Sequence, residues 1–207
     1  MKKDIFGQVR LQDEGSYRVV VRDLGAARWW ARSLARQLLA REARALAVLD
    51  GEDGVPMLVA TGRDSLTRGF IDGAPMHDAR PQDPAYFRKA GKLLRRLHRL
   101  GVVHNDLAKE ANWLVTPDAG PAVVDFQLAW HAPHRGRLFR LLAREDLRHL
   151  LKHKRTYCPS QLTGRERRIL AQPSVPSRIW MRTGKPLYLL ITRRVLGWAD
   201  REGAADR

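Results

Sequence analysis

Residues 101–115, GVVHNDLAKEANWLV, place polar side chains between two apolar runs. His104, Asp106 and Asn112 lie in this segment, and Asp125 follows the next apolar run, PAVV. Carboxylate and amide oxygens are ligands for hard cations such as Mg²⁺, and a carboxylate can accept a proton from a hydroxyl group. Each residue alone is ordinary, because Asp and Asn are common in turns and helix caps. The ordered combination, rather than any one member, indicates a site for chemistry.

The first half of the chain predicts the elements of a short antiparallel sheet and one long helix. Residues 4–11 and 16–23 have the composition and alternation of two strands joined by the turn QDEG. Over residues 26–49 apolar side chains recur every three or four positions, as on one side of a helix. Two more strands are predicted at residues 56–61 and 65–71. The predicted sheet and helix would lie on one side of the polar segment.

The second half predicts a mainly helical region, which begins after the turn or hinge DGAP. Asp83 is placed to cap a helix that has Pro84 in its first turn and ends at Gly101. Strands at WLVT and PAVVDFQLAW would then enclose the polar segment. We therefore expect an α+β fold with a minimal N-lobe, residues 1–73, and a small helical C-lobe, residues 74–207, in a single domain.

The motif HNDLAKEAN followed by VVDFQ resembles the catalytic loop and metal-binding segment of the protein-kinase-like superfamily, H-x-D-x-x-x-x-N and D-F-G. Upstream, VVVR, LLAREARAL and FIDGAP follow the family order of lysine strand, glutamate-bearing helix and interlobe hinge. The resemblance covers roughly residues 5–155. It is strongest to small bacterial members, the lipopolysaccharide-core (Kdo/heptose) kinases and the RIO-type atypical serine/threonine kinases.

This resemblance implies transfer of the γ-phosphate of ATP, with Mg²⁺, to a hydroxyl group on a lipopolysaccharide-type sugar or a protein Ser/Thr. Asp106 would orient the hydroxyl as the base, and Lys109 would reach the transferring phosphate. Asn112 and Asp125 would bind the metal ion. His104 would be structural and would bond to the loop backbone. The polar segment would then be exposed in a cleft rather than buried in a core.

Glu42 lies on the apolar side of its predicted helix, where an unpaired charge would cost several kcal/mol. A cation should therefore face it, and Arg22 on the preceding strand is the candidate. The alternative is that Glu42 reaches water and pairs with a neighbour such as Arg41. By the resemblance, the Arg22–Glu42 pair would anchor the nucleotide phosphates. Val20 would line the base pocket, and Asp72 would lie at the hinge beside the nucleotide.

The chain departs from the family pattern in three places. Arg22 stands where kinases have lysine, and residues 4–88 contain no lysine. The step from Asp106 to Asn112 is one residue longer than in the family motif. Gln127 replaces the last residue of D-F-G, and the QDEGSY turn is short and poor in glycine. The alternative is therefore a catalytically impaired kinase-like module that binds RNA, a ribosome or an anionic membrane.

The charge distribution predicts an anionic partner. The chain has 38 Lys and Arg residues against 22 Asp and Glu, a formal net charge of +16. Within residues 133–169 four arginines recur on a helical period: Arg137, Arg140, Arg144 and Arg148. They form either a solvated face or a surface for a lipid-linked phosphosugar, a membrane surface or, less favoured, RNA.

Cys158 is the only cysteine, so an internal disulfide is excluded, which suits a reducing cytoplasm. No uncharged apolar segment approaches the ~20 residues that span a bilayer. We expect a cytoplasmic protein, with peripheral contact to the inner face of the membrane left open. The segment PLYLLITRRVLGW, residues 186–198, is interpreted either as a helix packed on the C-lobe or as an interfacial segment.

Overall fold

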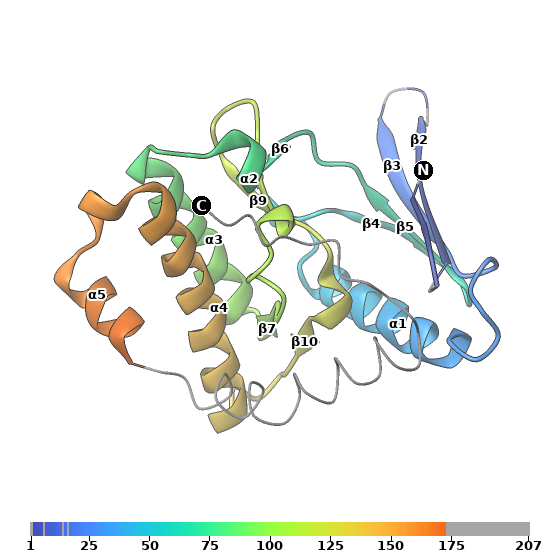
Figure 1. Ribbon diagram of the computed structural model, residues 1–207. Helices are drawn as coiled ribbons and strands as arrows, with labels where there is room; N and C mark the ends of the chain where they lie inside the picture. Colours follow the sequence, from blue (N-terminus) through green and yellow to red (C-terminus); the bar gives the residue numbers. More distant parts are fainter. Residues whose placement is uncertain (1, 6, 14, 16, 173–207) are drawn as a thin grey trace, which may run out of the picture. The chain divides into compact units, whose positions relative to one another are not determined.

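The computed structural model describes residues 2–5, 7–13, 15 and 17–172 (Figure 1). The chain divides into two compact units, residues 1–166 and 167–207. The described part of the second unit is the end of helix α5 (Gly164–Ala171) and the residue after it. The segment 186–198, predicted to be a packed helix or an interfacial segment, lies outside the described residues.

A five-stranded antiparallel sheet in the order β1-β2-β3-β5-β4 forms the first part of the fold. Its strands are β1 (Lys2–Asp4), β2 (Gly7–Asp13), β3 (Arg18–Asp23), β4 (Leu58–Thr61) and β5 (Ser65–Gly69). In the β3–β5 register Val20 faces Arg68, and Arg22 faces Leu66. Cross-strand partners and alternate residues share one face of a sheet, so these four side chains lie on the same face.

Helix α1 (Arg32–Val48) carries Glu42 and contacts both β4 and β5 of the sheet. The prediction that this helix begins near residue 26 is wrong. The apolar period does extend upstream, but Trp29 and Trp30 are 84% and 44% exposed, so no packing holds these residues in a helix. The helix also begins without a side-chain cap, which removes the sequence signal for its first residue.

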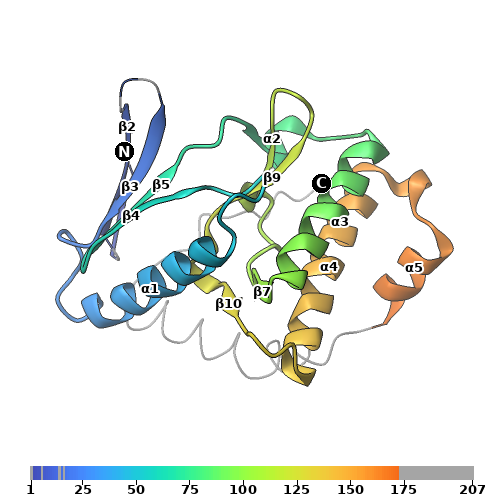
Figure 2. The same cartoon turned by 180° about the vertical axis from the view of Figure 1, so that it is seen from behind.

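The second part combines helices with short strands, and α3 and α4 lie side by side in two opposite views (Figures 1 and 2). The helices are α2 (Met76–Ala79), α3 (Pro84–Arg99) and α4 (Arg137–Tyr157). The short strands are β6 (Ala74–Pro75), β7 (Val102–Val103), β8 (Trp113–Val115), β9 (Pro121–Val123) and β10 (Trp130–His131). The 3₁₀ turns are η1 (Glu110–Asn112), η2 (Phe126–Leu128) and η3 (Pro159–Gln161).

The predicted start and end of α3 are confirmed. The carboxylate of Asp83 accepts a hydrogen bond from the N–H of Ala85 at 2.7 Å, and Pro84 is the first helical residue. Gly101, just after the helix, has φ +76°, and a Cβ there would lie 2.6 Å from the carbonyl oxygen of Ala132. Only glycine fits this position without moving the backbone.

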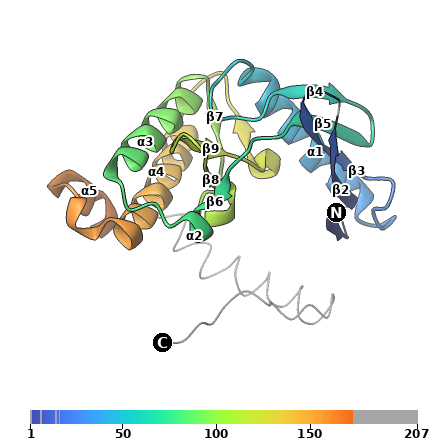
Figure 3. The same cartoon turned by 90° about the horizontal axis from the view of Figure 1, so that it is seen from above.

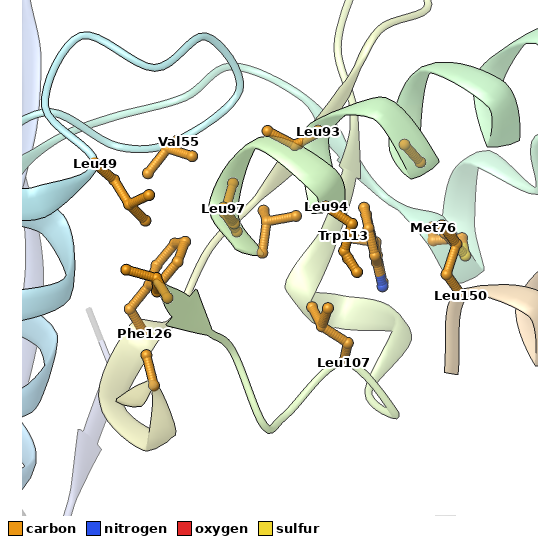
Figure 4. Close-up of a cluster of buried hydrophobic side chains, with 14 of the residues drawn as sticks. Leu49, Val55, Met76, Leu93, Leu94, Leu97, Leu107, Trp113, Phe126 and Leu150 are labelled. Carbon is orange, nitrogen blue, oxygen red and sulfur yellow. The ribbon is translucent and has the colours of Figure 1, made fainter. Parts of the chain in front are cut away.

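One buried apolar cluster connects α1 to the segments that carry the polar site (Figure 4). It includes Leu49 at the C-terminal end of α1, Leu97 from α3, Leu107 and Trp113 from the polar segment 101–115, and Phe126 from η2. Because α1 packs directly on η2, the helix that bears Glu42 is fixed relative to the residue before Phe126, which is Asp125. Figure 3 shows α1 and the strands β8 and β9 from above.

The fold is therefore mixed α/β, with an antiparallel sheet and several helices. Within the described residues, each helix is too short or too polar to cross a lipid bilayer.

Candidate active site

The predicted catalytic loop brings Asp106, Lys109 and Asn112 into direct contact. The amide nitrogen Nδ2 of Asn112 donates to the carbonyl oxygen of Asp106 at 2.8 Å and to its carboxylate Oδ2 at 3.0 Å. The ammonium of Lys109 lies 2.9 Å from the same Oδ2. The carboxylate of Asp106 is mostly buried, with 15% of the side chain exposed. The loop therefore holds one aspartate in a fixed orientation between an amide and a cation.

A 3₁₀ turn accommodates the additional residue between Asp106 and Asn112. The turn η1 begins at Glu110, whose carboxylate accepts a hydrogen bond from the hydroxyl of Tyr157 at 2.6 Å. Nε2 of His153 donates to the carbonyl oxygen of Leu107 at 2.8 Å. Both partners come from α4, so the longer loop is fastened to a helix at two points.

His104 is fully buried and supports the loop, as predicted for a structural residue. Its Nε2 donates to the carbonyl oxygen of Val124 at 3.0 Å, and its Nδ1 accepts from the N–H of Asp106 at 3.3 Å. The ring lies 4.7 Å from that of Phe126. Burial lowers the pKa of His104, which favours the neutral ring that this pair of hydrogen bonds requires.

Asp146 on α4 also positions this loop, and the sequence analysis did not identify it. Its buried carboxylate accepts the backbone N–H groups of His104 at 2.8 Å and Asn105 at 3.0 Å. It also lies 3.3 Å from Nε2 of His98 on α3. The sequence does contain a signal for Asp146, because it is an acid four residues before Leu150 on the apolar side of a basic helix. The same kind of signal, an acid on the apolar side of a helix, identified Glu42.

Asp125 immediately precedes η2, and its side chain is hydrogen-bonded to that of Gln127. Nε2 of Gln127 donates to Oδ1 of Asp125 at 2.6 Å, so the residue that departs from the D-F-G pattern holds the aspartate. The N–H of Val124 donates to the carbonyl oxygen of Asn112 at 3.0 Å. Asn112 and Asp125 therefore lie at neighbouring ends of the β8–β9 pair.

Glu42 is completely buried between two arginines. Arg22 lies 3.6 Å and Arg68 lies 3.2 Å from its two carboxylate oxygens. The predicted Arg22–Glu42 pair is confirmed, and the alternative of a water-exposed Glu42 paired with Arg41 is wrong. Burial raises the pKa of Glu42 and lowers the pKa of Arg68, in each case opposed by the partner's charge.

Two features of this cluster extend the prediction. Nη2 of Arg22 lies 3.7 Å from Oδ1 of Asp125, so one guanidinium connects the sheet to the η2 segment. Arg68 was missed, although its place two residues after Leu66 in a strand puts both side chains on one face. Since Leu66 is buried, alternation alone predicts that Arg68 points inward.

Within the part of the chain that the structure describes, the other two predicted nucleotide contacts make no side-chain hydrogen bond or ion pair with this network. Val20 is half-buried on the same sheet face as Arg22. Asp72 has a 70% exposed side chain and lies 4.0 Å from Arg18, whose guanidinium covers the ring of Phe70 at 4.2 Å. Their nucleotide roles remain predictions.

No protein-family model and no curated protein matches the chain. Among solved structures, the chain is similar to the Rio2 kinase from Chaetomium thermophilum, with a TM-score of 0.58 and 18% sequence identity. The fold is protein-kinase-like. The similarity covers 78% of this chain and 58% of the Rio2 kinase chain, so this chain spans little more than half of that kinase's length. At this level of sequence identity, the similarity to the Rio2 kinase is evidence for the fold alone.

Proposed function

We propose that this chain is an ATP-dependent phosphotransferase of two lobes, which transfers the γ-phosphate of ATP to a hydroxyl group. The observation that carries the proposal is the orientation of Asp106, held by Asn112 and Lys109 on a loop fastened to α4. Phosphoryl transfer depends mainly on positioning and on neutralising charge, so an oriented carboxylate beside a cation is the arrangement that it needs. Asp106 would orient the acceptor hydroxyl, and Lys109 would reach the transferring phosphate.

The residues at the predicted Mg²⁺ site fit a hard cation. The Asn112 nitrogen makes both hydrogen bonds to Asp106, so the amide oxygen is the atom that would ligate the ion. In Asp125, Oδ1 faces Gln127 and Arg22, which leaves Oδ2 for the ion. Mg²⁺ commonly uses one or two protein oxygens, and water and substrate phosphates supply the rest. When bound, it would neutralise charge on the phosphates of ATP.

Arg68 supports a phosphate-binding role for Arg22 in place of the family lysine. Arg68 is the nearer of the two cations to Glu42, at 3.2 Å against 3.6 Å, and it neutralises that carboxylate from the neighbouring strand. Arg22 is therefore not needed to neutralise Glu42, and its other contact is Asp125, the proposed metal ligand. Its planar guanidinium can bind a phosphate through two hydrogen bonds. Val20 and Asp72 would lie beside the base and at the hinge.

Thermal unfolding with and without ATP and Mg²⁺ tests this function. We expect a metal-dependent rise in the melting temperature of the wild type, a smaller rise for Asp125→Ala, and a wild-type rise for Asp50→Ala, an exposed aspartate outside the site. A rise that is equal in all three proteins would place the nucleotide elsewhere. No rise at millimolar ATP would contradict the proposal and favour a kinase-like module without nucleotide chemistry. That module is the second candidate function, because an arginine rather than a lysine stands at position 22.

The acceptor is proposed to be a lipopolysaccharide-type sugar or a protein Ser/Thr, met in the cytoplasm or at the inner face of the membrane. Labelled ATP incubated separately with a cell-envelope fraction and a soluble protein fraction distinguishes these. Label in lipid that requires Asp106 supports the sugar, and label in protein supports Ser/Thr. Label that persists with Asp106→Asn in both fractions would count against phosphotransfer by this site.

A further inference from the structure

A cavity of about 860 Å³ lies where α3 ends and α4 begins, outside the candidate active site. Its lining includes Arg95, His98 and Arg99 from α3, His134 and Arg135 from the segment before α4, and Arg140 from the first turn of α4. None of the described residues that line the cavity is acidic. The cavity is therefore a concave surface with four permanent positive charges and two histidines.

Among the residues that the structure describes, the four arginines of this cavity have no side-chain partner. Within the described residues, none of Arg95, Arg99, Arg135 and Arg140 makes an ion pair or a hydrogen bond through its side chain. By contrast, Arg96, beside Arg95 in the chain, binds Glu52 at 2.7 Å. Like charges gathered around a concavity create a positive potential that an anion would neutralise.

The first turn of α4 adds a second attraction for an anion at the same place. The helix begins after Gly136 with no side-chain cap and no acidic residue in its first turn. The N–H of Arg140 is the first to bond within the helix, to the carbonyl oxygen of Gly136. The preceding N–H groups have no acceptor within the helix, and the helix dipole favours negative charge beside them.

The size and floor of the cavity define the ligand class. Pro133, Phe139 and Ala143 supply apolar surface among the arginines. Cavities of about 300–1,000 Å³ hold whole small molecules rather than single ions. We propose that this cavity binds a phosphate monoester carried on a sugar or a lipid headgroup, with the phosphate at the α4 N-terminus and the arginines, and the sugar or glycerol part against the apolar floor.

The same observations disfavour RNA as the occupant. Single-stranded RNA is held largely by bases stacked on exposed aromatic rings. Phe139 is only 3% exposed, so the rings available for stacking among the described lining residues are the imidazoles of His98 and His134. The cavity therefore offers four arginines and little aromatic surface for stacking.

The proposal does not rest on phosphotransfer, because binding can be measured without turnover. The probes are glucose 6-phosphate, followed by calorimetry, and phosphatidylcholine vesicles with or without phosphatidic acid, followed by co-sedimentation. Glucose and pure phosphatidylcholine are the controls that lack a phosphate monoester. Binding to the sugar phosphate indicates a soluble ligand, and binding that requires phosphatidic acid indicates a lipid headgroup.

Paired charge variants of the full chain locate the site. Arg99→Gln with Arg140→Gln removes two cavity arginines, and we expect at least about tenfold weaker binding, since each loses a charge-assisted hydrogen bond to phosphate. Arg63→Gln with Arg155→Gln, exposed and outside the cavity, removes the same charge and should change affinity by less than about threefold. Equal weakening by both pairs would overturn the proposal, because general charge would then explain binding.

Gly136→Asp provides a variant whose fold is not endangered. Gly136 has φ −65°, and a Cβ there meets no atom closer than 3.9 Å. An aspartate at this N-cap should raise the melting temperature, because it caps α4, while its charge competes with the phosphate and lowers affinity at least about threefold. Retained affinity in this variant, binding of neither probe by the wild type, or cavity-dependent binding of a single-stranded RNA oligonucleotide alone would each overturn the assignment.

Discussion

Two arginine-rich regions of this molecule use their charge in opposite ways. At the sheet, Arg22 and Arg68 share one carboxylate, Glu42, which is completely buried. Between α3 and α4, four exposed arginines line a cavity without any acid. Buried charges are tolerated only when they are paired, whereas exposed charges are screened by water and cost little. Loss of a charge in the first region is therefore expected to lower stability strongly, whereas loss of a charge in the second should change stability little.

The strongest test of this contrast is Glu42→Ala. It leaves two largely buried guanidinium groups without their carboxylate and should lower the free energy of unfolding by about 3–5 kcal/mol. Glu52→Ala, which removes the part-exposed partner of Arg96, is the matched control and should cost less than about 1 kcal/mol. Urea unfolding measures both. Equal losses would mean that burial does not distinguish the two pairs.

Asp146→Ala tests a buried acid that contacts both His98, which lines the cavity, and the backbone of the predicted catalytic loop. The carboxylate serves the N–H groups of His104 and Asn105, and an unsatisfied buried group costs about 1–3 kcal/mol. We expect a loss of about 2–4 kcal/mol, measured in urea, and the exposed pair Arg36–Asp64 provides the control Asp64→Ala. If the two losses are alike, Asp146 does not position the loop.

Separate substitutions of Arg22 and Arg68 should distinguish a role in ATP binding from a role in stability. Arg22→Gln is expected to weaken ATP binding at least about tenfold, because Arg22 also faces Asp125 and would contact phosphate. Arg68→Gln should lower the free energy of unfolding by about 1–3 kcal/mol and change ATP affinity less. Calorimetry with ATP and Mg²⁺, combined with urea unfolding, measures both. A larger affinity loss in the Arg68 variant would reverse the assignment.

The smallest effect is expected at the cavity. Arg99→Gln removes an exposed, unpaired charge, so the free energy of unfolding should change by no more than about 0.5 kcal/mol. A loss above about 1 kcal/mol would show that this arginine is a structural residue.

Local signals made part of this structure predictable from the sequence. Asp83, Pro84 and Gly101 fix the ends of α3 through a cap, a fixed φ and a left-handed turn, all of which depend on neighbours in the chain. The site motif was found because His104, Asp106 and Asn112 occupy one short loop. Glu42 was found because a buried charge requires a partner.

The remainder depends on contacts between distant residues. Arg68 and Asp146 act across 26 and 42 residues of sequence, on Glu42 and His104, and a single sequence does not show such pairs directly. The prediction that four arginines form one exposed face of α4 is only partly correct. Arg137, Arg140 and Arg144 are exposed, but Arg148 is buried and lies 3.5 Å from Glu145. Helical period alone cannot tell which of several arginines meets the neighbouring helix.

The presence of two arginines beside Glu42 also affects which substitutions this chain can accept during evolution. With Arg68 already beside the carboxylate, a substitution at position 22 does not strand Glu42 in the interior. The residue at position 22 could therefore change in one step, without waiting for a compensating change elsewhere, and selection there would act on what Arg22 contacts besides Glu42 rather than on folding.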